Sequence, residues 1–484
     1  MPGANERTAL LRGASNGSRN QNSGSNREAP QDSAEFGKWR KWVLTLLVTT
    51  YTAYYFCKTN LSLAIPHLED EEGLKRSDIT IVLTSGYIMY LAGKFLSGLC
   101  VDNFGGKKTL LAGLIGSIVT SVAFTLKVHP AYFATIRGVN QLFSSVGWGA
   151  CVKIVRGWYP PSRAAHAIAV ASLAETLGDA LVRVTLGSAL LYGLSWQGMF
   201  LVSAAVAGLL FVPACFVPGV PSDKDLDDPV EKDEEAHEDM KARSVFTGDD
   251  EGLLAIVKDM RVWLLAAQLL VVILVRESFA SFVSSLIASE LELSKATSSI
   301  ASAIFPAMGA ISSIAGGVLL DKASQNRRGL IPFASLACLT VALLGMWAAT
   351  PESAGDKALQ ILKDGSSGGG ADMKQIALFL AMIGMIALFL YAPKVIIDGA
   401  FVMDLAGGAE KVGSVTAFVT GVGYIGGILS PSISGMVADA RGWPDAILLM
   451  VGLSAVVTGA SGLYWWLDLK KLKGSNNITE DNDA

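Results

Sequence analysis

Cysteine and histidine are scarce in this chain, and their positions argue against two common kinds of site. There are 5 cysteines and 4 histidines in 484 residues. They are Cys57, Cys100, Cys151, Cys215 and Cys338, and His67, His129, His166 and His237. All the cysteines fall inside long apolar segments and the histidines show no ligand spacing, so neither a disulfide framework nor a metal site is indicated. We expect no metal and no cofactor.

The motifs of nucleotide-driven and catalytic proteins are also missing. No Gly-x-x-x-x-Gly-Lys-Ser/Thr loop occurs, so we expect an energy source other than ATP. The segment from Thr420 to Gly427 contains Gly-x-Gly-x-x-Gly, but it lies in an apolar run without βαβ context, which favours close helix packing over a dinucleotide site. No Ser/His/Asp set or pair of carboxylates stands in a catalytic context, and we expect a protein that is not an enzyme.

Charge is scarce as well, and apolar runs are long. Charged residues make up 17% of the chain, hydrophobic residues make up 51%, and the mean hydropathy is +0.43. This balance is typical of a polytopic membrane protein. A membrane span needs about 20 apolar residues, and segments of this kind are too long for barrel strands. About twelve occur, near 42–66, 79–99, 108–127, 131–157, 164–193, 197–217, 260–287, 297–320, 330–350, 374–403, 411–437 and 444–467. The sequence therefore predicts an all-α membrane protein with twelve transmembrane helices.

The distribution of charge predicts how the chain is divided and oriented. Residues 1–38 are polar without an apolar signal-peptide core, and we expect a disordered cytoplasmic tail there. Residues 39–217 and 259–468 are expected to form six-helix halves, with a charged cytoplasmic linker at 218–258 and a cytoplasmic tail at 469–484. If twelve spans are present, the basic clusters between them share one side, which the positive-inside rule makes cytoplasmic. These residues are Lys38, Arg40, Lys41, Lys107, Lys108, Arg156, Arg163, Arg327, Arg328, Lys470, Lys471 and Lys473.

The two halves correspond in sequence. Asp102 and Asp321, in charged loops after the second and eighth spans, are 219 positions apart. Lys58 in the first span and Arg276 in the seventh are 218 apart, so two intramembrane cations occupy equivalent places. Paired halves of this kind hold a substrate near the membrane midplane and work by rocking against each other. We expect Asp102 and Asp321 to take part in gating contacts rather than in binding.

Several motifs resemble those of a known family. The loop GLCVDNFGGKK, from Gly98 to Lys108, resembles the signature loop of the major facilitator superfamily. The segments YYFCKTNLSLAIP, GKFLSG, GWGACVK, LVRES and VGSVTAFVTGVGYIGG resemble the organophosphate:phosphate antiporters, which include glycerol-3-phosphate and glucose-6-phosphate carriers. The resemblance implies the major facilitator fold and exchange of a phosphate ester for inorganic phosphate. It also implies that one basic residue from span 1 and one from span 7 clamp the phosphate group.

Arg276 occupies the family's span-7 position, whereas span 1 carries Lys58 in place of arginine. The change keeps a cation but removes the planar fork that binds phosphate oxygens in pairs. Snorkelling of Lys58 to an interface and pairing of Arg276 with Glu277 are the structural alternatives, although adjacent helix positions point about 100° apart. Tyr51 and Tyr54 share a helix face with Lys58, where they either line the cavity or serve in ordinary packing.

Further basic residues extend this set. Lys94 matches a lysine of the family in span 2, and the alternative is an anchor near Asp102. Lys153 ends GWGACVK, in which both prolines of the family pattern are replaced, so a local break in that helix is in doubt. Lys394 and Asp398 follow Pro393, and they form either an internal ion pair or a substrate contact. The excess of cations predicts a cavity that attracts anions.

Span 5 departs most from the family. Glu175, Asp179 and Arg183 recur every four residues and therefore share one helix face. The family carries a histidine where Glu175 aligns. Two carboxylates so close repel each other when both are ionised, which suggests that Glu175 or Asp179 couples transport to protons. The alternative is a structural network in which Asp179 and Arg183 neutralise each other.

Together these features predict a secondary active transporter of a small anion. The first hypothesis is exchange of a phosphate ester for inorganic phosphate by alternating access. The alternatives are proton-coupled transport of an organic acid or other anion on the same fold, and a non-transporting membrane sensor. We expect a monomer in the lipid bilayer that binds a small anion and no nucleic acid. The tail motif ERTALL resembles an acidic dileucine signal read by sorting adaptors through Glu6, Leu10 and Leu11, which favours an endolysosomal or vacuolar membrane over the plasma membrane or a plastid envelope.

Overall fold

The computed structural model describes residues 34–224, 226, 258–350, 373–406 and 409–482, and twelve long helical segments account for most of them. The first six are α1 (Ala34–Asp70), α2 (Arg76–Phe104), α3 (Gly106–Ala123), α4 (Pro130–Trp158), α5 (Pro161–Leu191) and α6 (Trp196–Ala214). The next three are α9 (Met260–Leu291), α10 with α11 (Lys295–Ala301 and Ile304–Lys322) and α12 (Leu330–Ala349). The last three are α14 with η4 and α15 (Met373–Val395, Ile396–Phe401, Val402–Ala406), α16 with η5 and α17 (Ala409–Pro431, Ser432–Met436, Val437–Arg441), and α18 (Trp443–Asn482). Short 3₁₀ turns lie at η2 (Pro221–Lys224) and η3 (Gln325–Arg327).

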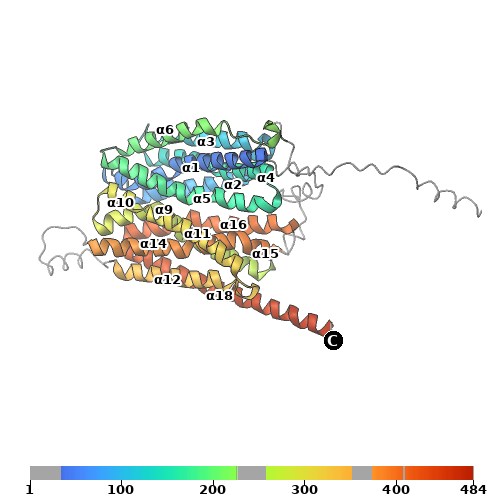
Figure 1. The fold of residues 1–484 in the computed structure, drawn as a ribbon. Helices are drawn as coiled ribbons and strands as arrows, with labels where there is room; N and C mark the ends of the chain where they lie inside the picture. Colours follow the sequence, from blue (N-terminus) through green and yellow to red (C-terminus); the bar gives the residue numbers. More distant parts are fainter. Residues whose placement is uncertain (1–33, 225, 227–257, 351–372, 407–408, 483–484) are drawn as a thin grey trace, which may run out of the picture.

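The helices form two halves that lie side by side, α1 to α6 in one and α9 to α18 in the other (Figure 1). Both halves begin at the same end of the bundle, which we call the termini end, and the opposite end is the far end. The expected fold, an all-α membrane protein with twelve helices in two six-helix halves, is confirmed for the described residues.

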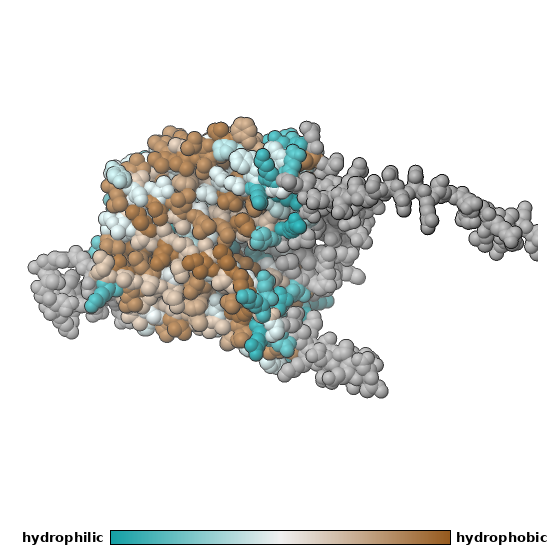
Figure 2. Space-filling model, viewed as in Figure 1, coloured by the Kyte–Doolittle hydropathy of each residue, from teal (hydrophilic) through white to brown (hydrophobic). Residues whose placement is uncertain are grey.

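Eight of the twelve segments are long and apolar enough to cross a membrane by length and composition alone. The other four are α1, α3, α4 and α5, and three of these carry charged residues away from their ends, such as Lys58 in α1 and Glu175 in α5. On the face seen in Figure 2 the bundle shows a broad apolar band, with hydrophilic residues gathered at the termini end. Leu209, Val341 and Val456 point outward in this band, as expected for side chains that face lipid.

Local sequence explains where several helices begin. Pro130 opens α4, and the preceding His129 accepts a hydrogen bond through Nδ1 from the backbone N–H of Ala131 at 3.2 Å. The Ser195 side chain accepts from the N–H of Gly198 at the start of α6. These positions satisfy N–H groups that have no partner inside the helix. The helix α4 runs unbroken through GWGACVK, so the loss of the family's prolines leaves a continuous helix there.

Two helices of the second half contain π-helical turns. The turn η4 follows Pro393 in α14, and η5 follows Pro431 in α16. Proline has no N–H to donate and its ring crowds the preceding turn, so a widened turn is a physical response to it. Each turn shifts the face of the helix that follows it.

The structure also differs from the expected boundaries. The helix α1 already begins at Ala34, inside the segment 1–38 that was expected to be a tail, and α18 continues to Asn482, through most of 469–484. Most of the linker 218–258 and the motif at Glu6, Leu10 and Leu11 lie outside the described residues.

The tryptophans that head the last helix of each half illustrate the repeat. Trp196 begins α6 and Trp443 begins α18, both at the far end. The Trp196 Nε1–H donates to Glu72 at 2.9 Å, and the Arg76 guanidinium lies 5.3 Å from the centre of the Trp443 ring. Both rings therefore pack against the connection between α1 and α2, although Trp443 belongs to the other half.

Contacts between the halves gather from the middle of the bundle to the far end. The Thr80 hydroxyl on α2 donates to the Pro431 carbonyl at 3.3 Å. Lys295 at the start of α10 forms an ion pair with Asp70 at the end of α1, at 3.1 Å. The site described next lies on the termini side of these contacts.

Candidate functional site

An ion pair that joins the two halves lies at the centre of the site. Arg276 on α9 binds Glu175 on α5 through Nη2 and Oε1, and it binds its neighbour Glu277 through Nη1 and Oε1 at 2.6 Å. Arg276 is only 8% exposed. The pairing with Glu277, considered unfavourable because adjacent positions diverge on a helix, is present, since the long arginine side chain bends back to reach it.

The carboxylate of Glu277 extends this network toward α2. The Tyr87 hydroxyl donates to Glu277 Oε2 at 2.8 Å and lies 3.1 Å from the Ser281 hydroxyl. The Arg276 guanidinium also lies 5.3 Å from the centre of the Tyr391 ring on α14. Arg276 is therefore held by groups from three helices, and one of them, α5, belongs to the opposite half.

Lys58 faces the same region from α1 and rests on aromatic rings. Its Nζ lies 4.8 Å from the ring centre of Tyr90 and 5.4 Å from that of Tyr55. The Lys94 Nζ lies 5.2 Å from the centre of the same Tyr90 ring. The Tyr90 ring in turn packs against Tyr424 of the opposite half, with 5.6 Å between the ring centres. Tyrosine faces attract cations without neutralising them. Neither lysine pairs with a carboxylate in the part of the chain that the structure describes, so both can contact an anion.

Glu175 is the carboxylate on which these cations converge. The positive charges that act most strongly on it are those of Lys394, Arg276, Lys58 and Lys94. Two of them come from each half of the bundle. The expected excess of positive charge is thus gathered around one carboxylate where the halves meet.

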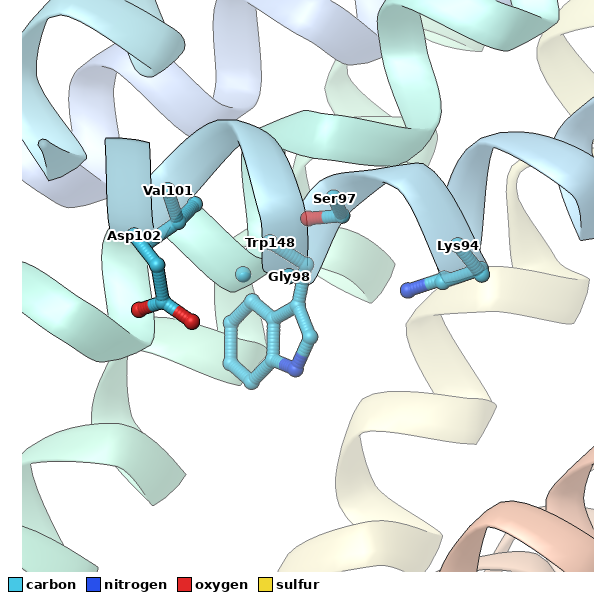
Figure 3. Close-up of a pocket in the computed structure, with 7 residues that line it drawn as sticks. Lys94, Ser97, Gly98, Val101, Asp102 and Trp148 are labelled. Carbon is cyan, nitrogen blue, oxygen red and sulfur yellow. The ribbon is translucent and has the colours of Figure 1, made fainter. Parts of the chain in front are cut away.

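A pocket of about 260 Å³ leads along α2 from Lys94 toward the termini end. Lys94 marks its inner part, Trp148 forms a wall, and Asp102 lies at its outer end (Figure 3). The remaining lining residues are Ser97, Gly98, Val101 and Gly149. The pocket thus reaches Lys94, one of the central cations, from the termini side of the contacts between the halves.

Lys153 lies at that outer end rather than beside Arg276. Its Nζ is 3.3 Å from Asp102 Oδ1, and the two side chains are 39% and 73% exposed. Asp321, the equivalent of Asp102, is also exposed at the end of α11. The structure therefore places Lys153 in a contact between α4 and α2 with Asp102, away from the central cations.

The two tyrosines expected beside Lys58 pack elsewhere. The Tyr54 hydroxyl donates to the Leu110 carbonyl on α3 at 2.5 Å, and the side chain is 2% exposed. The Tyr51 ring packs 5.4 Å from Trp148 and 5.7 Å from Tyr55. Tyr54 is thus a packing residue between helices of one half, and Tyr51 supports the wall of the pocket.

The polar face of α5 divides into two parts. Asp179 Oδ1 binds Arg183 Nε at 3.1 Å and accepts from the Thr59 hydroxyl at 2.8 Å. Arg183 donates across the interface to the Ser302 hydroxyl at 3.1 Å and to the Ala280 carbonyl at 2.7 Å. Glu175 instead pairs with Arg276, so each carboxylate has its own cation and their mutual repulsion is relieved. This matches the structural network considered for Asp179 and Arg183.

The pair expected between Lys394 and Asp398 is replaced by other contacts. Asp398 accepts a hydrogen bond from the Thr420 hydroxyl at 2.9 Å, while the charge of Lys394 acts on Glu175. The π turn η4 starts between the two residues and changes the four-residue spacing of an α-helix.

Sequence reasoning missed several residues of the site. Arg137 on α4 is 5% exposed, and its Nη1 donates to the backbone carbonyl of Lys58 at 3.1 Å. A charged residue inside an apolar span was the available signal. Tyr90, Tyr391 and Tyr424 carried no such signal, because a tyrosine in a span is more often a packing residue.

Comparison with known proteins agrees with this arrangement. The family model described as Major Facilitator Superfamily matches residues 47–396. A probable hexose phosphate transport protein of Chlamydia pneumoniae is 23% identical over 431 residues, which cover 86% of this chain and 89% of that protein. The glycerol-3-phosphate transporter of Bacillus subtilis is 22% identical, covering 89% and 94%. The membrane sensor protein UhpC of Salmonella typhimurium is 23% identical, covering 89% and 91%.

A solved structure shares the fold. The inward-facing, unoccupied crystal structure of a bacterial homolog of the human lysosomal transporter Spinster matches with a TM-score of 0.68 at 15% identity, over 89% of this chain and 98% of that one. The relatives are named as transporters and a sensor, in agreement with the expectation that the protein is not an enzyme. With its twelve helices in two halves and the match over 47–396, the chain belongs to the Major Facilitator Superfamily.

Proposed function

We propose that the protein exchanges a small phosphate ester for inorganic phosphate across a membrane by alternating access. The observation that carries this proposal is the convergence of Lys58, Lys94, Arg276 and Lys394 from both halves on one central place. A phosphate group presents several anionic oxygens and can engage more than one of these cations at once. Relatives named for transport of hexose phosphate and glycerol-3-phosphate support the same class of substrate.

Binding proceeds by replacement of Glu175. The phosphate group enters through the pocket beside Lys94, takes the place of the Glu175 carboxylate on Arg276 Nη2, and is contacted from the other half by Lys58. Lys58 supplies a point charge where the resembled family has a planar arginine, so orientation of the phosphate depends mainly on Arg276. Arg137 acts as a positioning residue through its hydrogen bond to the Lys58 backbone.

Transport then requires the far-end contacts to open while the termini end closes. Lys295 with Asp70, and Arg183 with Ser302 and Ala280, are the contacts that must separate. The ends of α2 and α11, which carry Asp102 and Asp321, close the other end. Both termini face the cytoplasm in this proposal, because the basic residues gather at that end.

The test is uptake of labelled inorganic phosphate into proteoliposomes preloaded with unlabelled phosphate, compared with Arg276→Ala. We expect saturable uptake that disappears in the variant. Addition of glucose-6-phosphate or glycerol-3-phosphate outside should compete with the label. Folded wild-type protein without phosphate uptake above protein-free liposomes would refute the phosphate assignment, and organic acids with a proton gradient would be tested next.

A sensor is the second candidate, because a relative matched over 89% of this chain is named a membrane sensor. The same cations would then bind phosphate without moving it. Saturable binding to the purified protein, together with absent uptake in the liposome assay, would favour this function.

The membrane in which the protein works is proposed to be endolysosomal or vacuolar, on the basis of ERTALL at residues 6–11. A fluorescent fusion is expected to reach that compartment and to move to the cell surface when Leu10 and Leu11 are changed to Ala. An unchanged distribution would exclude this signal as the determinant.

A further inference from the structure

The protein supplies a counter-anion of its own to the central arginine. Arg276 presents two Nη groups, of which Nη1 contacts Glu277 on the same helix and Nη2 contacts Glu175 on the opposite half. Glu175 is 14 residues from the start of α5 and 16 from its end, and Arg276 is 16 and 15 residues from the ends of α9. The pair thus sits midway along both helices, where rocking of the halves displaces side chains least.

We propose that Glu175 lets the unloaded carrier change conformation, so that the protein performs net transport of its anion as well as exchange. The inference rests on the proposed function and extends it to the mode of transport. An unpaired cation in a low-dielectric site is strongly disfavoured. A carrier whose cations are neutralised only by substrate can therefore reorient only when loaded, which makes exchange obligatory. Here a carboxylate of the protein can neutralise Arg276 during the return step.

Glu277 alone does not provide this balance. It belongs to the same helix as Arg276 and reaches the opposite half only through the Tyr87 hydroxyl, which is uncharged, so it offsets Arg276 but none of the cations supplied by the other half. The Glu175 carboxylate also has other cations nearby when it leaves Arg276. Lys394, Lys58 and Lys94 act on its carboxylate together with Arg276, so a phosphate that displaces it from Arg276 leaves it beside other cations. Neither the loaded nor the unloaded carrier then has to bury an uncompensated carboxylate.

The experiment compares two modes of efflux from the same proteoliposomes. Vesicles containing the full-length protein are loaded with labelled inorganic phosphate, and voltage is clamped with potassium and valinomycin. Efflux is measured into buffer with unlabelled phosphate, which reports exchange, and into phosphate-free gluconate buffer, which reports net transport. Wild type should release label in both buffers, with net efflux within about tenfold of exchange.

Two variants separate the role of the carboxylate from its shape. Glu175→Gln should lower the ratio of net efflux to exchange by more than about tenfold, whatever its exchange rate, because Arg276 then lacks its bridging anion. Glu175→Asp keeps the charge and should retain net efflux. A single thermal transition of each purified variant in detergent shows that it is folded.

The possible outcomes distinguish this inference from the function beneath it. Wild-type exchange without net efflux would overturn the inference and leave the proposed function standing, and so would equal net efflux by wild type and Glu175→Gln. Absence of phosphate flux in both buffers would overturn the proposed function itself, and the inference with it. If Glu175→Gln exchanges no phosphate, the ratio of net efflux to exchange in the wild type alone tests the inference.

Discussion

The ammonium group of Lys58 lies over the ring of Tyr90, 4.8 Å from its centre, and makes no ion pair with another described residue. An aromatic face attracts a cation without supplying an opposite charge, and the contact contributes roughly 0.5–2 kcal/mol. Tyr90 in turn packs against Tyr424 of the opposite half. Lys58 is thereby placed at the interface of the halves, with its charge directed to the site.

Replacing Lys58 tests this role. Lys58→Ala should raise the KM for phosphate exchange about 10–100-fold, since a hydrogen bond to a charged group contributes about 1.5–3 kcal/mol. Lys58→Arg should preserve exchange, because the guanidinium can bind two oxygens. Lys127→Ala, which removes the same charge at an exposed far-end position, serves as the control. An unchanged KM in Lys58→Ala would place the lysine outside the binding site.

Removing Arg276 should affect stability as well as transport. Arg276→Ala leaves Glu175 and Glu277 without their cation in a buried place, which costs about 3–5 kcal/mol and should lower Tm in detergent. Combining it with Glu175→Gln and Glu277→Gln removes the unpaired charges. We expect this triple variant to recover much of the Tm and none of the phosphate exchange. Recovery of exchange would argue that Arg276 has only a structural role.

The close contact between α16 and α9 in the second half predicts that no side chain larger than that of glycine fits at position 426. A Cβ added at Gly426 on α16 would lie 2.0 Å from the backbone oxygen of Leu270 on α9, so the helices would have to separate. Gly426→Ala should destabilise the protein by about 1–3 kcal/mol, measured as a lower Tm. Gly452→Ala on α18 is the matched control, because no atom lies within 4 Å of its added Cβ. Equal Tm values for the two variants would contradict this packing.

The far-end contacts predict a pH dependence of stability. A hydrogen bond with the His67 ring holds the pKa of Glu71 below its ordinary value, and Lys295 contributes at 3.3 Å. A lowered pKa in the folded state means that the charged carboxylate stabilises the fold above the ordinary pKa, and that this contribution is lost as pH falls through the lowered value.

The difference in Tm between wild type and Glu71→Gln should therefore be full well above the ordinary pKa of a glutamate, about 4.3, and should shrink as pH falls below it. His67→Ala removes the imidazole that hydrogen-bonds Glu71 and should reduce this difference in Tm. Because half of the Glu71 side chain is exposed, the effect will be small. A difference that grows on acidification would reverse the sign argued here.

The sequence determined the membrane character, the number of helices and their division into halves, because these depend on the length and periodicity of apolar runs. Its internal repeat also identified Lys58 and Arg276 as equivalent cations. It indicated that Asp179 and Arg183 pair, since four-residue spacing on one helix brings their side chains together whatever surrounds them.

Only the tertiary structure decided which partners the remaining charges take. Glu175 pairs with Arg276, 101 positions away, and Lys153 pairs with Asp102, 51 positions away. It also directed Tyr54 toward α3 and brought Tyr90 under Lys58. Such contacts depend on which helices are neighbours and how each is rotated, and π turns and bending side chains alter both. Spacing within one helix reports which face a residue shares, and packing between helices determines what that face meets.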